Sequence, residues 1–265
     1  MIPKIIHYCW FGGNEKPELI KKCIASWKKN LSGFEIMEWN EDNFDINKSR
    51  FTSYAYEKKK WAFVSDVARL EALIKYGGFY MDTDVEILSD DPITQFCGYD
   101  NVFVFETERR INTGLFCGCE LNSDIMKKLL DGYSGIEFKG DVSQLNTSIN
   151  FYALCNCFPN LVFNNETQII NGNLFWSMKE YSRVMHHHAT HSWLDDKVEY
   201  KVKWKETKIK RFLRNPKIYQ TLGKKSFKLM NAYEFLTYDL PDLGIVYFLK
   251  RKFRKLRGSS RNDIQ

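Results

Sequence analysis

The spacing of apolar residues predicts an α/β fold from the first segment onward. Residues 2–10 form a mostly apolar run that predicts a buried strand, and Gly12-Gly13 predicts the turn that follows it. Residues 17–29 place apolar side chains at helical spacing, with Pro17 suited to the first turn. Residues 34–39 alternate between apolar and polar positions, as a second strand does. This strand–helix–strand order is typical of a βαβ unit in an α/β sheet.

The hydrophobic pattern continues through further helices and strands. The predicted helices span residues 61–76, 123–133 and 142–157, and the predicted strands span residues 79–81, 85–88, 101–105 and 113–117. Residues 184–188 are expected to form a late strand or a loop. Gly77-Gly78 supplies the glycine with which helices often end. No repeat and no low-complexity linker interrupts this order, so we expect residues 1–200 to form one domain.

Composition and charge add a second region. The chain has 265 residues, of which 44% are hydrophobic and 15% aromatic, enough for a substantial core. The net charge of +6 is uneven, because residues 201–257 carry 17 Lys/Arg against four acidic residues, whereas residues 1–200 carry 21 basic and 28 acidic residues. We therefore expect a basic, mainly helical C-terminal region at 201–257 and a flexible tail at 258–265.

The start of the chain and its cysteines bear on location. Residues 1–6 lack the basic start and long apolar stretch of a signal peptide, and no window approaches the roughly 18 to 20 apolar residues of a membrane helix. These features predict a cytoplasmic protein. The seven cysteines, an odd number, predict reduced thiols. The pairs Cys117/Cys119 and Cys155/Cys157 leave open either a zinc site or a purely structural origin, as alternate positions of a strand or as part of a helix surface.

Four charged residues around one helix and one strand carry the strongest chemical signal. Asp66 and Arg69 are three positions apart, so they share a face of the predicted helix. The following strand leads into Asp82 and Asp84 at its carboxyl end, where α/β sheets bind ligands. If strand alternation continues through these residues, the two carboxylates point the same way. They then suit Mg²⁺ or Mn²⁺, which leave coordination positions for the oxygens of a diphosphate.

Each of these signals also has a purely structural interpretation. Two aspartates one residue apart often mark an exposed turn, and Asp66 with Arg69 is typical of an ion pair on a helix surface. The ordered combination with the glycine pair and the short strand favours a metal and diphosphate site over these alternatives.

Three separated motifs resemble a known family. Residues 61–86, the opening residues 2–13, and His187-His188 followed by Ser192-Trp193 are similar to the DXD-containing sugar transferases of glycosyltransferase family 32. That family includes bacterial capsule and lipopolysaccharide enzymes and fungal mannosyltransferases. More distantly, the chain resembles the glucosyltransferase domains of large clostridial toxins. The resemblance covers about residues 1–195 and implies a GT-A fold, a Rossmann-like α/β domain that uses Mn²⁺ or Mg²⁺ and a nucleotide-diphosphate sugar.

The resemblance also implies roles for single residues. Trp10 stacks on the nucleobase, although a buried core tryptophan is the structural alternative. By the same resemblance, Asp66 and Arg69 contact the donor sugar and its phosphate side. Asp82 contacts the ribose, the sugar or a metal-bound water, and Asp84 binds the metal directly. Ser192 and Trp193 belong to a loop that closes over the diphosphate.

The remaining candidates are less specific. Among His186, His187, His188 and His191, we favour His187 as the residue that approaches the metal. His7 is expected to be a core or sheet-end residue. Asn112, beside Thr113-Gly114, corresponds to a polar position near the donor sugar. Gly140-Asp141-Val142 stands where many relatives have Gly-Pro, so acceptor specificity is not carried over.

The basic region at 201–257 has three interpretations. It is a solvated helical surface, a nucleic-acid binding region or a segment that docks on an anionic membrane. No recognised nucleic-acid motif accompanies the charge, so we expect no nucleic-acid partner. Aromatic side chains interleaved with the basic ones favour the membrane surface.

Together these features predict a metal-dependent, retaining glycosyltransferase. It moves a hexose from a UDP-sugar to a lipid-linked glycan acceptor in capsular or lipopolysaccharide synthesis, at the inner face of the cell membrane. The alternatives are a mannosyltransferase that uses GDP-mannose, a toxin-like enzyme that glycosylates a protein, and a non-catalytic scaffold that binds sugar nucleotides.

Overall fold

A computed structural model describes residues 1–89, 92–107, 110–139, 144 and 146–188. Within these residues, the main sheet has eight strands: β1 (Ile5–Cys9), β2 (Glu35–Trp39), β3 (Gly78–Tyr80), β5 (Asn101–Thr107), β6 (Arg110–Ile111), β7 (Cys117–Cys119), β8 (Gln168–Ile170) and β9 (Asn173–Trp176). The strand order is β2-β1-β3-β7-β5-β9-β8, and β6 pairs with β5. Strands β2, β1, β3, β5 and β9 run in one direction, so the sheet is mixed but mostly parallel.

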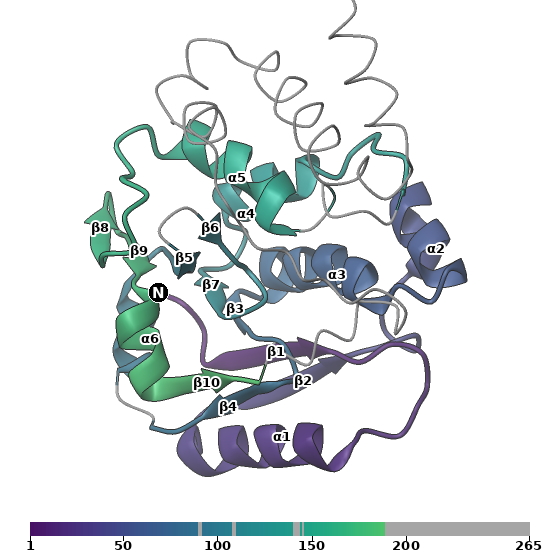
Figure 1. Ribbon diagram of the computed structural model, residues 1–265, viewed down its shortest axis with the longest axis horizontal. Coiled ribbons are helices and arrows are strands. Elements are labelled where there is room, and N and C mark those ends of the chain that lie inside the picture. Colours follow the sequence, from purple (N-terminus) through teal and green to yellow (C-terminus); the bar gives the residue numbers. More distant parts are fainter. Residues whose placement is uncertain (90–91, 108–109, 140–143, 145, 189–265) are drawn as a thin grey trace, which may run out of the picture. The chain divides into compact units, whose positions relative to one another are not determined.

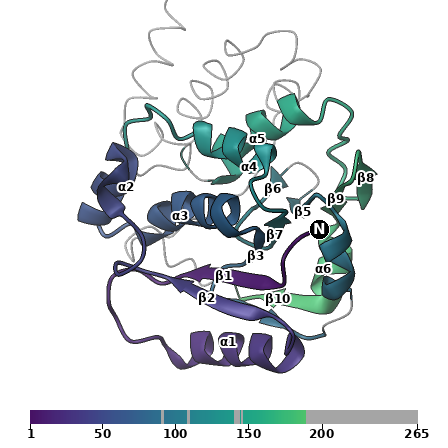
Figure 2. The ribbon, with the colours of Figure 1, turned by 180° about the vertical axis from the view of Figure 1, so that it is seen from behind.

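Helices and a small second sheet surround the main sheet. The helical elements are α1 (Glu18–Asn30), η1 (Ile46–Lys48), α2 (Arg50–Glu57), α3 (Trp61–Tyr76), η2 (Ile93–Gly98), α4 (Asp124–Asp131), α5 (Asn146–Cys157) and α6 (Met178–Val184). Strands β4 (Val85–Ile87) and β10 (Met185–His187) pair antiparallel in the second sheet. Helix α1 lies on one face of the main sheet, and α3 lies on the other (Figures 1 and 2).

The opening of the chain follows the prediction. Strand β1 pairs in parallel with β2, and α1 forms the connection between them. Pro17 stands at the N-cap of α1, directly before the first helical residue. The apolar side of α1 buries Ile20, Cys23, Ile24 and Trp27. The predicted α/β class is therefore confirmed.

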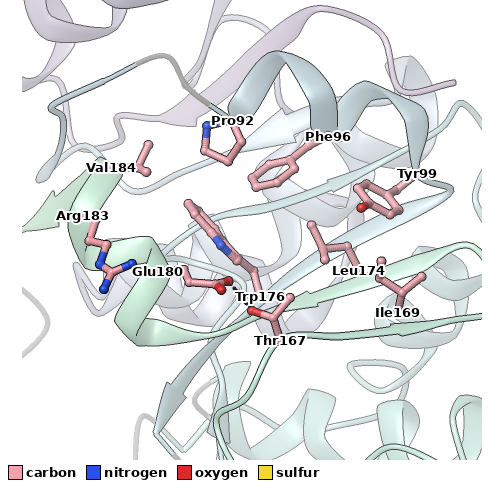
Figure 3. Close-up of a pocket in the computed structure, with 10 residues that line it drawn as sticks. All are labelled: Pro92, Phe96, Tyr99, Thr167, Ile169, Leu174, Trp176, Glu180, Arg183 and Val184. Atoms are coloured by element: carbon pink, nitrogen blue, oxygen red, sulfur yellow. Dashed lines mark hydrogen bonds between the residues drawn. The ribbon is translucent and has the colours of Figure 1, made fainter.

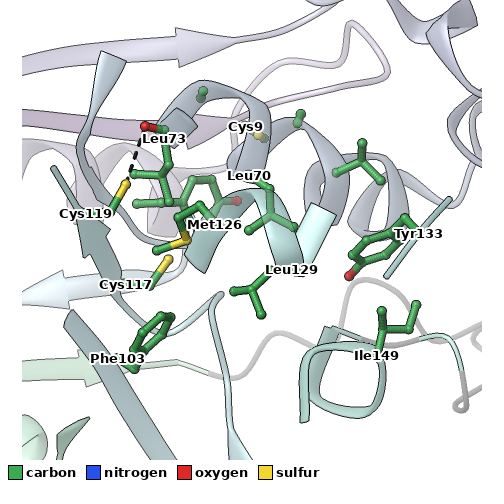
Figure 4. Packing of buried hydrophobic residues seen from close by; sticks show 14 of the residues in the cluster. Cys9, Leu70, Leu73, Phe103, Cys117, Cys119, Met126, Leu129, Tyr133 and Ile149 are labelled. Atoms are coloured by element: carbon green, nitrogen blue, oxygen red, sulfur yellow. Dashed lines mark hydrogen bonds between the residues drawn. The ribbon is translucent and has the colours of Figure 1, made fainter. Parts of the chain in front are cut away.

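Each face of the sheet has its own hydrophobic core. On the α3 side, Leu70 and Leu73 pack with α4 residues Met126 and Leu129 and with Phe103 (Figure 4). On the α1 side, a second cluster joins Trp27, Phe79 and Trp176. Because the sheet is buried on both faces, its strands consist largely of consecutive apolar residues.

The cysteines belong to these cores. All seven are free thiols. Cys117 and Cys119 are both fully buried on β7, and burial raises the pKa of the Cys117 thiol to about 12. Cys155 and Cys157 lie on α5. The first pair occupies alternate positions of a strand, as considered, whereas the second pair is on a helix with Cys155 buried and not on the helix surface.

Side chains of α1 take the place of a neighbouring strand for β4. The indole N–H of Trp27 donates to the Val85 carbonyl at 2.7 Å. Asn30 donates to the Ile87 carbonyl at 2.8 Å, and the Ser26 hydroxyl accepts from the Ile87 N–H at 2.9 Å. Since β10 pairs with the other edge, β4 is bonded on both sides although its sheet has only two strands.

The junction after α3 is fixed by a buried histidine. Helix α3 ends at Gly77, which takes a φ of +64°. The His7 ring donates from Nε2 to the Gly77 carbonyl at 2.8 Å and accepts at Nδ1 from the indole N–H of Trp39 at 3.1 Å. His7 is fully buried, which confirms its expected place in the core at the sheet end.

Some predicted elements were wrong or missing. The strand predicted at 113–117 is a turn at Thr113–Leu115, and β7 begins only at Cys117. The segment 82–84 is likewise a turn between β3 and β4, in which the Val85 N–H donates to the Asp82 carbonyl at 3.1 Å. Asp82 and Asp84 therefore do not follow strand alternation. The elements that were not predicted are α2, α6, the β8–β9 hairpin, the short strand β6 and the 3-10 helices η1 and η2.

Several predictions fall outside the described residues. They concern the domain boundary at residue 200, the basic region 201–257, the tail 258–265, Gly140-Asp141-Val142, His191, Ser192 and Trp193. Within the described part, no helix has the length and apolar character that crossing a bilayer requires.

Candidate active site

Arg69 lies at the centre of the candidate site. Helix α3 brings Asp66 and Arg69 to its buried face, one turn apart, and their side chains are only 4% and 3% exposed. The Arg69 guanidinium contacts Asp66 Oδ1 at 2.9 Å and Asp82 Oδ1 at 3.3 Å. The predicted pairing of Asp66 with Arg69 therefore occurs inside the protein, not on its surface.

The strand that leads to Asp82 contributes a second contact. Tyr80 is almost fully buried, with its ring 4.5 Å from the Arg69 guanidinium carbon. Its hydroxyl donates to Asp82 Oδ1 at 3.0 Å. One carboxylate oxygen of Asp82 is thus held by an arginine and a phenol, while 35% of the Asp82 side chain remains exposed. Asp82 is the most open of the four predicted charged residues.

The turn before β7 closes on Asp82 from the other side. The Asp82 N–H donates to the Gly114 carbonyl at 2.7 Å. The Gly114 N–H donates to Asn112 Oδ1 at 2.8 Å, and Asn112 donates to Glu106 at 3.1 Å. A Cβ atom at Gly114 would overlap Asp82 Oδ2 and lie 3.0 Å from an Arg69 nitrogen. Asn112 therefore shapes the turn that holds Asp82, whereas its predicted place near the donor sugar stays a prediction.

Helix α5 supplies residues that were not predicted. Asn146 donates to Asp66 Oδ1 at 3.2 Å, and its own oxygen accepts from the Thr113 N–H at 3.3 Å. Burial and the Asp82 charge raise the pKa of Asp66 to about 6, while Arg69 and Asn146 act in the opposite direction. Asp66 is therefore less acidic than an exposed aspartate, and its ionised form depends on the Arg69 charge.

Asp84 is joined to the last described strand. The pairing of β4 with β10 sets Val85 opposite His187, and the His188 N–H donates to the Asp84 carbonyl at 2.9 Å. His187 Nε2 lies 3.3 Å from Asp84 Oδ1. Burial alone would lower the pKa of His187, but the bond to Asp84 and the charges of Asp84, Asp82 and Glu106 raise it.

The other described histidines point to different partners. His188 contacts Glu86 at 3.0 Å, and Lys22 contacts the same carboxylate at 3.0 Å. The ring of His186 lies against that of His188, with centroids 4.5 Å apart. Among His186, His187 and His188, the one that meets Asp84 is therefore His187, which is the residue that we favoured. Its ligation of a metal stays a prediction.

The described residues suit a metal ion whose remaining coordination positions are filled by the substrate. In the described part of the chain, no three His, Cys, Asp or Glu side chains gather closely enough to hold a metal alone. Asp84 with His187, and the exposed carboxylate of Asp82, offer oxygen and imidazole donors. Mg²⁺ is commonly bound by one or two carboxylates together with substrate phosphates and water. The donor set therefore fits a metal that arrives with a diphosphate.

Trp10 lies at the carboxyl end of β1, and its described contacts are local. Its side chain is partly buried, and its indole N–H donates to the Asn14 carbonyl at 2.7 Å. The Lys16 ammonium lies 5.5 Å from the centre of the Trp10 ring. These contacts orient the indole, whereas the predicted stacking on a nucleobase stays a prediction.

An apolar groove of about 350 Å³ lies away from these charged residues (Figure 3). Phe96, Leu174 and Trp176 line it, and Thr167 bonded to Glu180 stands at its rim. None of the predicted site residues lines this groove. The candidate active site is therefore the charged cluster of Asp66, Arg69, Asp82 and Asp84, and not this groove.

Sequence reasoning missed Tyr80, Gly114 and Asn146 as parts of the site. A signal for Asn146 was present, because Asn146 and Asn150 are one helical turn apart in a helix that is otherwise largely apolar. Both are buried, and Asn150 donates to the Thr113 hydroxyl at 3.4 Å. Two amides on the buried side of one helix indicate polar partners in the interior.

Comparisons with known proteins give one family and two partly similar structures. The family model described as "capsular polysaccharide synthesis protein" matches residues 1–138. A comparison with curated proteins gave no match. One similar solved structure is the PaToxG glycosyltransferase, with 19% identity and a TM-score of 0.46 over 60% of this chain and 70% of that one. Another is a glycosyltransferase involved in the glycosylation of the major capsid of PBCV-1, with 12% identity and a TM-score of 0.41 over 71% and 95% of the two chains.

Proposed function

The chain belongs to the capsular polysaccharide synthesis protein family, and we propose that it is a metal-dependent glycosyltransferase that uses a UDP-sugar. The observation that carries this proposal is the arrangement around Asp82. The partly exposed carboxylate of Asp82 contacts Arg69 and Tyr80. Asp84, two residues later in the chain, contacts His187. Such a site suits the charged end of a nucleotide-diphosphate sugar.

The metal would be held by Asp84, by His187 and by Asp82 either directly or through water. Bound there with the diphosphate, Mn²⁺ or Mg²⁺ would neutralise charge on the leaving group. The backbone turn at 82–84 and the pairing of β4 with β10 keep these donors in place before the substrate arrives. Preorganised charge of this kind is often the largest contribution to catalysis.

Arg69 acts on the substrate through Asp82. Its guanidinium is buried, and its described bonds go to Asp66, Asp82, Thr113 and the Ser65 carbonyl. Its charge opposes the rise in the pKa of Asp66 that burial causes. Its contact with Asp82 orients that carboxylate as an acceptor for a donor hydroxyl or a metal-bound water. The predicted contact of Arg69 with the phosphate requires a change in these bonds on donor binding.

We infer transfer with retention of configuration, by attack on the same face from which the diphosphate leaves. Within the described site, the carboxylates are engaged with Arg69, Tyr80 and His187, which disfavours a covalent sugar–enzyme bond. The acceptor hydroxyl would then give its proton to the leaving phosphate. GDP-mannose is the second candidate donor.

Donor hydrolysis tests the proposal. Purified protein with Mn²⁺ is incubated with a panel of UDP- and GDP-sugars, and the release of nucleoside diphosphate is measured. We expect release from one donor, and a loss on the order of 10²–10³-fold in Asp84→Asn, because a metal contributes several kcal/mol to such a transition state. Asp124→Asn, on the exposed side of α4, is the matched control that keeps full activity.

Two results would contradict this proposal. If no donor is cleaved and none binds in the presence of metal, the chain does not use any of these nucleotide sugars and the proposal fails. If Asp84→Asn keeps the rate of the wild type, Asp84 is not the metal ligand.

We further propose that the acceptor is a lipid-linked glycan at an anionic membrane surface. The support is the charge of residues 201–257, since each Lys or Arg near such a surface contributes about 1 kcal/mol. In a flotation assay with anionic vesicles, the full chain should rise with the lipid, and a chain that ends near residue 200 should not. If both chains float with the vesicles, or neither does, the basic region is not the membrane contact and this proposal fails.

A further inference from the structure

Two loops at the same edge of the sheet are joined through one carboxylate. Strands β1 and β2 are parallel neighbours, so the turn at 10–14 and the loop at 40–43 leave the sheet at the same end. Glu41 Oε1 accepts from the Gly12 N–H at 2.6 Å and from the Tyr56 hydroxyl at 2.9 Å. The two loops and α2 therefore meet at one acceptor atom.

The loop that carries Glu41 is itself rigidly bonded. The Asn40 N–H donates to Asn43 Oδ1 and the Asp42 N–H donates to Asn40 Oδ1, both at 2.9 Å. Asn43 also donates from its side chain to the Glu38 carbonyl at 2.8 Å. Asparagine side chains commonly stabilise turns in this way. The bonds within its own loop therefore fix the position of Glu41, independently of the turn that it contacts.

Gly12 can be held only through its backbone. It takes a φ of +95°, and a Cβ there would lie 2.7 Å from the Trp61 ring. The Trp61 ring in turn meets the Tyr56 ring edge-on, with centroids 4.8 Å apart. A side chain at position 12 would therefore clash, and the N–H is the group that Glu41 holds.

Trp10 depends on the same turn. Its backbone N–H donates to the Trp39 carbonyl at 2.8 Å, and its indole N–H donates to the Asn14 carbonyl at 2.7 Å. Between these two anchors stand Gly12 and Gly13, both with positive φ. Two successive glycines leave a free turn with many conformations. The Glu41 bond removes that freedom.

The charge of Glu41 suits this role. Burial would raise its pKa, but the bonds from the Gly12 N–H and the Tyr56 hydroxyl lower it. Glu41 is therefore ionised at neutral pH, and hydrogen bonds to a charged acceptor are stronger than those to a neutral one.

We propose that Glu41 is a positioning residue for the nucleoside end of the donor. It holds the Trp10–Asn14 turn, and with it the indole of Trp10, in the shape that receives the base. This inference rests on the proposed function. A turn ordered in advance spares the donor the entropy cost of ordering it, so the gain appears in nucleotide affinity. Glu41 touches no reacting atom, and the rate at saturating donor should stay unchanged.

Comparison of a nucleotide with pyrophosphate tests this role. The affinities of the full-length protein for UDP, for GDP and for inorganic pyrophosphate are measured by calorimetry with Mg²⁺. We expect Glu41→Ala to weaken binding of the preferred nucleotide about tenfold, the size expected for losing bonds to a charged group. Glu41→Gln, which keeps an acceptor, should recover part of this loss. Pyrophosphate binding should change less than about twofold in both variants.

Glu71→Gln is the matched control, because Glu71 makes an exposed ion pair with Lys48 and should bind all ligands as the wild type does. In turnover, Glu41→Ala should raise KM for the donor and leave kcat unchanged. Equal loss of nucleotide and pyrophosphate affinity would show a general structural defect and overturn the inference, as would unchanged UDP and GDP affinity. A wild type that binds neither nucleotide would overturn the proposed function itself.

Discussion

Gly114 brings the backbone close to two side chains of the candidate site. Its carbonyl accepts from the Asp82 N–H, while its Cα faces Asp82 Oδ2 and an Arg69 nitrogen. The absence of a side chain here lets the turn before β7 close on the carboxylate. Position 114 thereby controls where Asp82 stands, although glycine offers no chemistry of its own.

Gly114→Ala should therefore damage catalysis more than stability. The added methyl group would push Asp82 or Arg69 aside, and a displacement of about 1 Å at a reacting group can cost on the order of 10²-fold in rate. We expect such a loss in kcat for donor cleavage, with little change in melting temperature. Gly98→Ala is the control, because a Cβ at Gly98 meets no atom within 4 Å. A variant with normal kcat would show that the turn adjusts without moving Asp82.

Among the elements, those with a strong local signal were predicted well. Helix α3 spans the predicted residues 61–76, because its apolar spacing and the glycines after it are both local features. The helix at 123–133 is present as α4 (Asp124–Asp131), with Ser123 as its N-cap. Asp66, Arg69, Asp82 and Asp84 were likewise found from short spacings, and the structure brings Asp66 and Asp82 to the same guanidinium.

Features that depend on distant contacts were not predictable in the same way. The run Thr113-Gly114-Leu115-Phe116 is apolar enough to resemble a strand, but its turn is set by bonds to Asp82 and Asn146. The partner of Glu41 is a backbone N–H, which leaves no trace in side-chain spacing. The largely apolar composition of α5 indicates that the helix is buried, but not that Asn146 meets Asp66 there.

For the molecule as a whole, two buried groups make stability depend on pH in opposite directions. Burial lowers the pKa of His7 from 6.5 to about 4, with a partial offset from the bond to Gly77. Between these values the unfolded chain binds a proton that the folded protein does not, so His7 reduces stability as pH falls from 6.5 towards 4. Asp66, whose pKa is raised from 3.8 to about 6, acts in reverse: stability is lost as pH rises through that range.

The variant His7→Gln should isolate the first of these effects, because it leaves Asp66 unchanged. The free energy of unfolding is measured in urea at pH 7 and at pH 4.5 for both proteins. The difference in the free energy of unfolding, wild type minus variant, should be about 2–3 kcal/mol smaller at pH 4.5 than at pH 7. The same substitution at the exposed His186 is the control. A difference that stays constant between the two pH values would show that His7 is not held neutral.

The pairing of β4 with β10 joins residues that lie far apart along the chain. Arg69 and Asp82 are 13 positions apart, whereas Glu86 and His188 are separated by 102. Closing the longer loop is slower and entropically more costly. A nascent chain that ends before His187 therefore contains Arg69 and Asp82 but lacks the partner of Asp84. We expect such a chain to lack half of the candidate site, whereas one that extends past His188 contains all of its described residues.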